Sequence, residues 1–194
     1  MIRFFDVVFS GLGLICLSPV LLVIYFCIKW ESKGGGFYAQ ERIGKNGVPF
    51  KLYKFRSMRQ GADKGSLITI GERDPRITNT GYFLRQYKLD ELPQLWNVFK
   101  GDMSLVGPRP EVEKYTRLYT EEQKKVLSVR PGITDWASIK YLDENRILGE
   151  AEDPDKAYIE QIMPDKIKYN MRWIEKQSVF EYFRIIINTF FRIP

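Results

Sequence analysis

The chain of 194 residues is long enough for one domain with a hydrophobic core and too short for two. It has no histidine and only two cysteines, Cys16 and Cys27, which excludes Ser-His-Asp and Cys-His catalysis and argues against a zinc site or a disulfide framework. All of the net charge of +6 lies in residues 1–60, where nine basic residues outnumber three acidic ones. Such an excess is expected of a surface that meets anionic lipid headgroups or an anionic substrate, although a solvated basic face gives the same count.

A run of 22 uncharged residues, 7–28, is the most apolar part of the chain and is long enough to cross a hydrocarbon core of about 30 Å as a helix. Ser18-Pro19 lies near its middle, where the proline removes a backbone donor and predicts a kink. A helix bent there can enter and leave the membrane by the same face. Arg3 precedes the run and Lys33 follows it, so the positive-inside rule gives no direction. On the residues alone, a straight span is favoured over the re-entrant helix.

The next segment carries the pattern of a β-hairpin. Asn46-Gly47 separates two runs of alternating residues, which predicts strands near Phe37–Ile43 and Phe50–Phe55. A polar loop with Gly and Asp in turn positions is then expected over Arg59–Arg76.

The middle of the chain predicts short helices. One is expected around Gly81–Tyr87, and another from about Asp90 to Phe99, with Pro93 in its first turn and Gly101 at its end. Charged helices are expected between Glu111 and Ser128.

The C-terminal stretch predicts an apolar helix. Ser178 stands three residues before Glu181, a capping-box pattern. An interfacial amphipathic helix and a buried core helix both fit the periodicity. The apolar positions at spacings of three or four are Phe180, Phe183, Ile187 and Phe191.

Asp90-Glu91 is the pair most suggestive of chemistry. Adjacent carboxylates at a helix start lie where backbone amides and the helix dipole attract phosphate, and Arg85 and Lys88 are near enough to neutralise it. A carboxylate nucleophile with Mg²⁺ held by oxygen ligands is a coherent set for phosphoryl transfer. An Asp-Glu pair also occurs at ordinary helix starts, where it has only a structural role.

Four blocks occur in order along the chain: KFRSM (Lys54–Met58), DPRIT (Asp74–Thr78), the long segment Gly81–Pro110 and RPGIT (Arg130–Thr134). Together they resemble the signature of the bacterial sugar transferases, the monotopic phosphoglycosyl transferases of polyprenyl-phosphate pathways. The resemblance covers essentially the whole chain and includes the Ser-Pro break in the apolar run.

The resemblance implies a role for each site residue. Asp90 is expected to be the nucleophile that takes the phosphosugar from the nucleotide, and Glu91 its partner in metal binding or in activating the lipid phosphate. The two would hold the implied cofactor, Mg²⁺, while Arg85 and Arg109 hold phosphate oxygens. The expected substrate-binding set is Lys54 and Arg56 at the membrane-facing mouth, Arg85, and the turn of Pro108, Arg109 and Pro110 at the nucleotide end.

The resemblance also implies an α+β, mostly helical monotopic membrane protein with a small β-hairpin and interfacial amphipathic helices. Residues 1–33 would form a re-entrant membrane helix hairpin broken at Ser18 and Pro19, which reverses the preference for a straight span. Residues 34–194 would form a catalytic domain with a C-terminal interfacial helix, one functional unit on the cytoplasmic face of the bacterial inner membrane. Glu181 departs from the family pattern, where Asp is expected.

The implied reaction transfers a sugar 1-phosphate from a UDP-sugar to undecaprenyl phosphate, as the first step of glycoconjugate assembly. The implied partners are these two substrates, membrane lipid and downstream glycosyltransferases, with no nucleic acid. Two other classes compete. A membrane-anchored scaffold explains the apolar helix but not the dense block from Asp90 to Pro110, and a nucleic-acid-binding protein would need an aromatic and basic stacking motif that is not visible.

Overall fold

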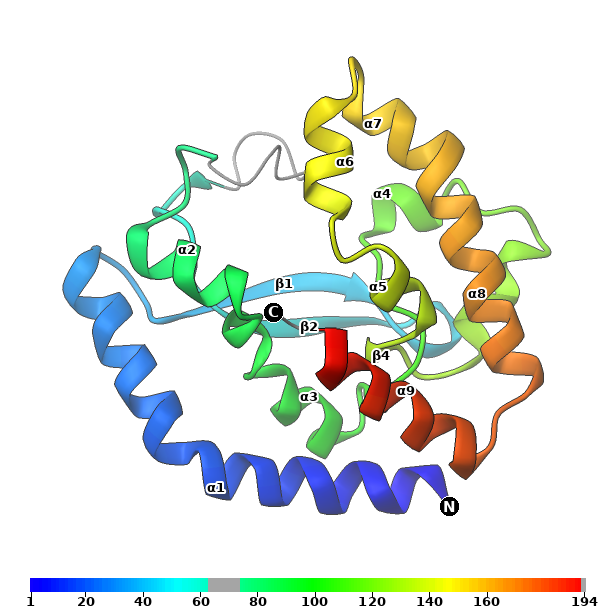
Figure 1. The fold of residues 1–194 in the computed structure, drawn as a ribbon, viewed down its shortest axis with the longest axis horizontal. Helices are drawn as coiled ribbons and strands as arrows, with labels where there is room; N and C mark the ends of the chain where they lie inside the picture. Colours follow the sequence, from blue (N-terminus) through cyan, green and yellow to red (C-terminus); the bar gives the residue numbers. More distant parts are fainter. Residues whose placement is uncertain (63–73, 193–194) are drawn as a thin grey trace.

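The computed structural model describes residues 1–62 and 74–192 (Figure 1). Most of these residues are helical and the strands form two small sheets, which confirms the predicted mostly helical fold with a small β-hairpin. The helices are α1 (Ile2–Glu31), α2 (Asn79–Gln86), α3 (Gln94–Lys100), α4 (Glu113–Thr116), α5 (Trp136–Lys140), α6 (Glu144–Glu150), α7 (Pro154–Ala157), α8 (Met163–Glu175) and α9 (Val179–Arg192). The strands are β1 (Phe37–Ile43), β2 (Pro49–Phe55), β3 (Ser104–Val106) and β4 (Gly132–Thr134). Short helical segments of other types are η1 (Lys45–Gly47), η3 (Leu89–Glu91), η4 (Gln123–Ser128) and η5 (Tyr158–Ile162).

The apolar helix α1 is continuous and bends part-way along, as Figure 1 shows. Pro19 lies inside it and cannot donate to the carbonyl of Ile15, four residues earlier. The hydroxyl of Ser18 donates to that carbonyl instead, at 2.8 Å. The predicted break therefore takes the form of a bend within one helix, while the re-entrant topology stays a prediction.

Both ends of α1 dock onto the rest of the chain. Near its start, the guanidinium of Arg3 donates to the carbonyls of Val98 and Phe99 at the end of α3, at 2.6 and 2.9 Å. Near its end, Ile28 is buried in an apolar cluster with Phe55 of β2. The start and the end of the helix therefore contact one and the same body.

Asp6 fastens α1 to the C-terminal helix. Its carboxylate is buried, and Oδ1 alone accepts hydrogen bonds from the hydroxyl of Ser104, the backbone N–H of Leu105 and the hydroxyl of Tyr182, each at 2.9 Å. One oxygen thus joins α1, β3 and α9. A charged residue in this apolar helix is tolerated because three donors replace the water that it gives up.

The predicted β-hairpin is confirmed. β1 pairs antiparallel with β2, with Phe37 opposite Phe55 and Ile43 opposite Pro49. Asn46 turns the chain with a φ of 58°, in the left-handed region that asparagine tolerates. The polar loop expected over 59–76 lies mostly outside the described residues.

The helix predicted from Asp90 to Phe99 is in two pieces, the single turn η3 and then α3. Pro93 divides them, because it has no N–H to donate to the carbonyl of Leu89. Gly101 ends α3 as predicted, with a φ of 104°. The fully buried amide of Asn97 docks α3 on β2, accepting from the N–H of Tyr53 at 3.0 Å and donating to the carbonyl of Lys51 at 2.7 Å.

A parallel strand pair, which the sequence pattern did not predict, follows α3. Ser104 of β3 pairs with Gly132 of β4, and Val106 pairs with Thr134. The chain after β3 passes so close to the start of β4 that position 132 requires glycine. A Cβ on Gly132 would stand 2.1 Å from the backbone nitrogen of Gly107. Between the strands, the predicted charged helices are the short α4 and the 3₁₀ segment η4.

The C-terminal helix α9 has one packed face and one exposed face. Its start is capped as predicted, with the hydroxyl of Ser178 accepting from the N–H of Glu181 at 3.1 Å. Tyr182 and Ile185 are fully buried. Phe180, Ile187, Phe190 and Phe191 are all more than half exposed. The helix is therefore amphipathic, which fits an interfacial role.

Replacing Asp6 by Leu should lower the free energy of unfolding by about 3–5 kcal/mol, because three buried donors lose their acceptor together. Replacing Tyr182 by Phe removes one donor and should cost only about 1 kcal/mol. Denaturation in detergent micelles, followed by circular dichroism, measures both. Equal effects of the two variants would mean that Asp6 does not collect these donors.

Candidate active site

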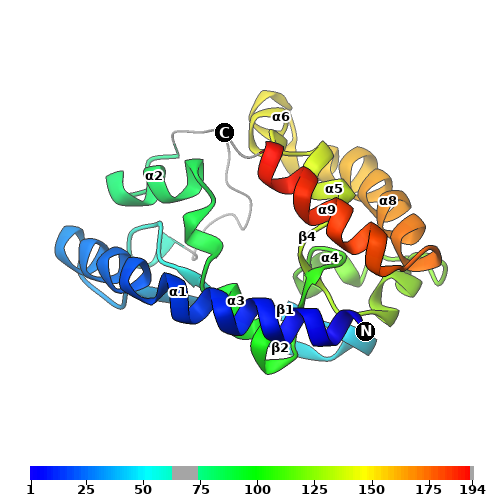
Figure 2. The ribbon, with the colours of Figure 1, turned by 60° about the horizontal axis from the view of Figure 1, so that its bottom comes forward.

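A cleft of about 1470 Å³ opens between two sides of the molecule. In Figure 2, α2 lies on one side and α6 and α9 lie on the other. Among the described residues that line the cleft, basic side chains outnumber acidic ones. They are Arg42, Lys54, Arg56, Arg59, Arg76, Arg85, Lys88, Arg109, Lys166 and Arg192, against Asp90, Glu91, Glu111 and Glu144. The balance suits a ligand with several negative charges.

Asp90 and Glu91 lie on the single turn η3 at this cleft. Lys88 enters the turn with a φ of 55°, a left-handed conformation that is uncommon for lysine, and Pro93 follows the turn. Asp90 is 7% exposed. Within residues 1–62 and 74–192, no hydrogen bond or ion pair reaches its carboxylate. A buried carboxylate without a partner is costly, and such groups gather at functional sites.

Glu91 is bound on both oxygens. Oε1 accepts from Nζ of Lys54 at 3.0 Å and from Nη2 of Arg109, and Oε2 accepts from Nη1 of Arg109 at 3.1 Å. The guanidinium therefore grips the carboxylate with two nitrogens, the geometry that arginine favours for carboxylates and phosphates. Lys54 comes from β2 and Arg109 from the turn after β3, so this ion cluster joins three segments.

The two neighbouring carboxyl groups have opposite pKa shifts. Burial raises the pKa of Asp90 and outweighs the opposing charges of Lys54, Arg85 and Lys88. Burial also acts on Glu91, but Arg109 and Lys54 outweigh it and hold the pKa of Glu91 well below its ordinary value. Glu91 therefore stays ionised, whereas burial disfavours the ionised form of Asp90.

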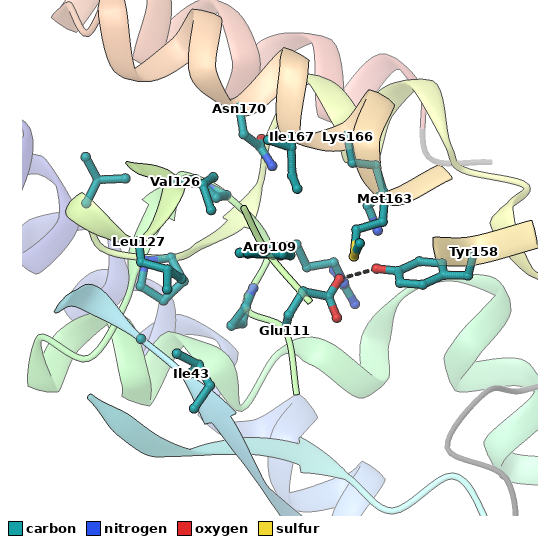
Figure 3. Close-up of a pocket in the computed structure, with 16 residues that line it drawn as sticks. Ile43, Arg109, Glu111, Val126, Leu127, Tyr158, Met163, Lys166, Ile167 and Asn170 are labelled. Atoms are coloured by element: carbon teal, nitrogen blue, oxygen red, sulfur yellow. Dashed lines mark hydrogen bonds between the residues drawn. The ribbon is translucent and has the colours of Figure 1, made fainter. Parts of the chain in front are cut away.

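Arg109 is held in place by its neighbours. Its backbone N–H donates to the buried carboxylate of Asp135 at 3.2 Å. The guanidinium of Arg42 donates to the carbonyl of Pro110 at 3.0 Å and lies 3.8 Å from Glu111. Figure 3 shows Arg109 beside Glu111, whose carboxylate accepts from the hydroxyl of Tyr158. No sequence pattern indicated this positioning role, because Arg42, Asp135 and Tyr158 are distant from Arg109 along the chain.

The predicted substrate-binding cations differ in what they contact. Arg85 and Lys54 line the cleft and act electrostatically on Asp90. Arg56 also lines it, but its guanidinium donates to the carbonyls of Ser32 and Lys33, just after α1 ends. Arg56 therefore fastens the end of α1, and its contact with substrate stays a prediction.

The remaining predicted residues shape the walls of the site. Pro110 lines the main cleft, and Pro108, Arg109 and Pro110 also line a second cavity of about 30 Å³. Figure 3 shows this second cavity. Ser18 and Pro19 lie at the bend of α1 and do not line the cleft. Lys88, which the sequence placed near Asp90 as a cation for phosphate, lines the cleft together with Asp90.

The acidic pair fits Mg²⁺ with substrate present. Within the described part of the chain, no three acidic, histidine or cysteine side chains gather. Mg²⁺ does not need such a cluster, because it is commonly held by one or two carboxylates together with substrate phosphates and water. Asp90 offers an open carboxylate, and Glu91 could join it only by releasing one of its two cations.

Glu181, where the family pattern leads to an expectation of Asp, has a structural partner. Its carboxylate accepts from the indole N–H of Trp136 at 2.7 Å, and it lies 3.5 Å from the guanidinium of Arg184. The longer side chain therefore still docks α9 against α5.

Comparison with known sequences places the chain among bacterial proteins. The family described as bacterial sugar transferase matches residues 1–193. A putative undecaprenyl-phosphate N-acetylgalactosaminyl 1-phosphate transferase of Bacillus subtilis is 46% identical over 120 residues, which are 62% of this chain and 67% of that protein.

Two longer relatives match nearly the whole chain. UDP-glucose:undecaprenyl-phosphate glucose-1-phosphate transferase of Escherichia coli is 35% identical over 96% of this chain and 39% of its own length. UDP-N-acetylgalactosamine-undecaprenyl-phosphate N-acetylgalactosaminephosphotransferase of Aeromonas hydrophila is 35% identical over 97% of this chain and 44% of its own length. The chain therefore spans less than half of these two relatives.

Replacing Lys54 by Met should raise the pKa of Asp90 further, because the opposing positive charge is lost while burial remains. The ionised fraction of Asp90 then falls at a given pH. As the pH is lowered, any reaction that uses this carboxylate should therefore begin to lose rate at a higher pH than in the native protein. Carbon NMR titration of the aspartate carboxyl groups, assigned with Asp90→Asn, measures the shift. Lys51→Met on the exposed face of β2 is the control, and equal shifts in both variants would contradict the prediction.

Proposed function

This chain belongs to the bacterial sugar transferase family, and we propose that it transfers a sugar 1-phosphate from a UDP-sugar to undecaprenyl phosphate. UMP and a polyprenyl-diphosphate sugar would be the products, and downstream glycosyltransferases would extend that sugar into a glycoconjugate. The observation that carries the proposal is Asp90, a buried residue whose carboxylate has no hydrogen-bond partner among the described residues, at a cleft rich in positive charge. The names of the relatives supply the two substrate classes.

In the first step, an oxygen of Asp90 attacks the phosphorus that carries the sugar. A bond forms between that oxygen and phosphorus, the bond from phosphorus to the bridging oxygen breaks, and UMP leaves with the electron pair. Ionised Asp90 is the reactive form, and Lys54, Arg85 and Lys88 favour it. Arg85 and Arg109 would neutralise the phosphate oxygens during the attack.

In the second step, a phosphate oxygen of undecaprenyl phosphate attacks the same phosphorus. The bond between Asp90 and phosphorus breaks, and the carboxylate is restored. A scaffold or a nucleic-acid-binding protein has no use for an adduct on this residue, so the adduct distinguishes the proposed enzyme from both alternatives.

Mg²⁺ is the proposed cofactor, held by Asp90 and, after rearrangement, by Glu91. When bound, it would offset the repulsion between the attacking carboxylate and the diphosphate. Glu91 has a second role within the chain itself, because it holds Lys54 and Arg109 at the edge of the cleft. As phosphate enters, Arg109 can turn one of its nitrogens from Glu91 to the substrate.

The proposed location is the cytoplasmic face of the bacterial inner membrane. α1 is long and apolar enough to cross a membrane by length and composition, and its outer face is widely exposed. A straight span would carry one end of α1 to the far side of the bilayer. Both ends instead contact the same domain, Arg3 at α3 and Ile28 at β2. This geometry supports a re-entrant helix over a crossing one.

Mixing the protein with its UDP-sugar and Mg²⁺, without lipid acceptor, should give a sugar-phosphate adduct and release UMP. Asp90→Asn keeps the shape and removes the nucleophile, so the adduct should vanish and turnover should fall by at least about a thousandfold. Intact-protein mass spectrometry detects the adduct, and Asp143→Asn, at an exposed carboxylate, is the control. Release of UDP in place of UMP would indicate direct glycosyl transfer and would contradict the role of Asp90.

Acceptor peptides for a cytoplasmic biotin ligase, fused at Met1 and after Lys33, should both be labelled if α1 re-enters. Pro19→Leu restores the missing backbone donor and should favour a straight crossing, which removes the label at Met1. Val20→Leu, the neighbouring change, should keep both labels. An unlabelled Met1 in the native sequence would overturn the one-sided topology.

A further inference from the structure

The cleft has an apolar part that the chemistry of phosphate transfer does not use. It lies between α1, the segment after Asp90, and α9 (Figure 2). Its lining comes from Leu17 and Gly13 of α1, from Leu92 and Leu95, and from Ile186 and Phe190 of α9. We propose that this groove binds the isoprenoid chain of the lipid acceptor, an inference that rests on the proposed function.

The groove is continuous with the reacting carboxylate. Leu92 stands two residues after Asp90, and both line the same cleft, together with Lys54 and Arg109. A ligand with a phosphate at Asp90 and an apolar tail would therefore meet cations at one end and hydrocarbon at the other. A polyprenyl phosphate has this division of charge, whereas a UDP-sugar is polar along its whole length.

Gly13 provides the room between α1 and η3–α3. A Cβ at this position would lie 3.2 Å from Cδ1 of Leu95, tighter than an ordinary contact. Phe9 and Phe183 meet edge to face, with ring centroids 5.9 Å apart, and both line the cleft. This aromatic pair bridges α1 and α9, so the groove has a wall on which a hydrocarbon chain can pack.

The groove opens toward the surface that is proposed to meet the membrane. Phe190 lines the cleft and is 76% exposed, and Leu12 and Ile15 lie exposed on α1 near Leu17. The tail of the acceptor could therefore reach the site from the bilayer without crossing water.

The chain offers two matched pairs of variants for the test. Phe190 and Phe191 are adjacent and both strongly exposed, but only Phe190 lines the cleft. Leu17 and Leu22 lie on the same helix, and only Leu17 lines the cleft. The cleft variants are Phe190→Ala and Leu17→Gln, and their controls are Phe191→Ala and Leu22→Gln.

The measurement is kcat/KM for undecaprenyl phosphate divided by kcat/KM for geranyl phosphate, an acceptor with a much shorter tail. Phe190→Ala and Leu17→Gln should lower this ratio about tenfold, because only the long chain loses contact. The controls should keep the native ratio. A similar fall in Phe191→Ala and Leu22→Gln, or no fall in the cleft variants, would overturn the inference.

A binding measurement separates this inference from the reaction itself. A polyprenyl phosphate with a photoreactive group in its tail should label α9 or the middle of α1 in the native protein, and unlabelled undecaprenyl phosphate should suppress that labelling. Labelling by a photoreactive phospholipid that undecaprenyl phosphate does not displace would assign the groove to bulk lipid and overturn the inference. Native protein that labels as expected but releases no UMP from any UDP-sugar would instead contradict only the proposed function.

Discussion

The ion cluster around Glu91 is the constraint on which the rest of the site depends. One carboxylate accepts from Lys54 of the β-hairpin and from Arg109 of the turn after β3. These segments are far apart along the chain, and Arg42 of the same hairpin adds contacts to Pro110 and Glu111. Removing one member of such a group leaves an uncompensated charge, which is far more costly than the pair is stabilising. The cluster therefore fixes the positions of the cations that face the cleft.

The two adjacent carboxylates have divided roles because their surroundings differ. Glu91 is saturated with cations and stays ionised, while Asp90 is buried without a hydrogen-bond partner in the described residues and has a raised pKa. Neighbouring groups with opposite shifts are the usual mark of an acid, base or nucleophile beside its support. The cost of keeping Asp90 open is a loss of stability that the surrounding contacts must offset.

The apolar helix is held by polar contacts that leave its outer face free. Arg3 and Asp6 hold its start, and Arg56 donates a hydrogen bond to the carbonyl of Ser32 just after its end. Since these groups point into the domain, the hydrophobic side chains of α1 can meet lipid without losing the fold. The same arrangement places an apolar groove beside a charged cleft.

The sequence by itself determined the local elements of this protein and the residue types that are available for its chemistry. Asn46-Gly47 predicted the hairpin, Pro19 the bend, and Ser178 the start of α9, because each acts on its own neighbours. The family motifs pointed to Asp90 before any contact was known. Only the tertiary structure decided that Glu91 is already bound by two cations, because partners from distant segments leave no local pattern. Burial decided the opposite pKa shifts for the same reason, since desolvation depends on what folds over a group.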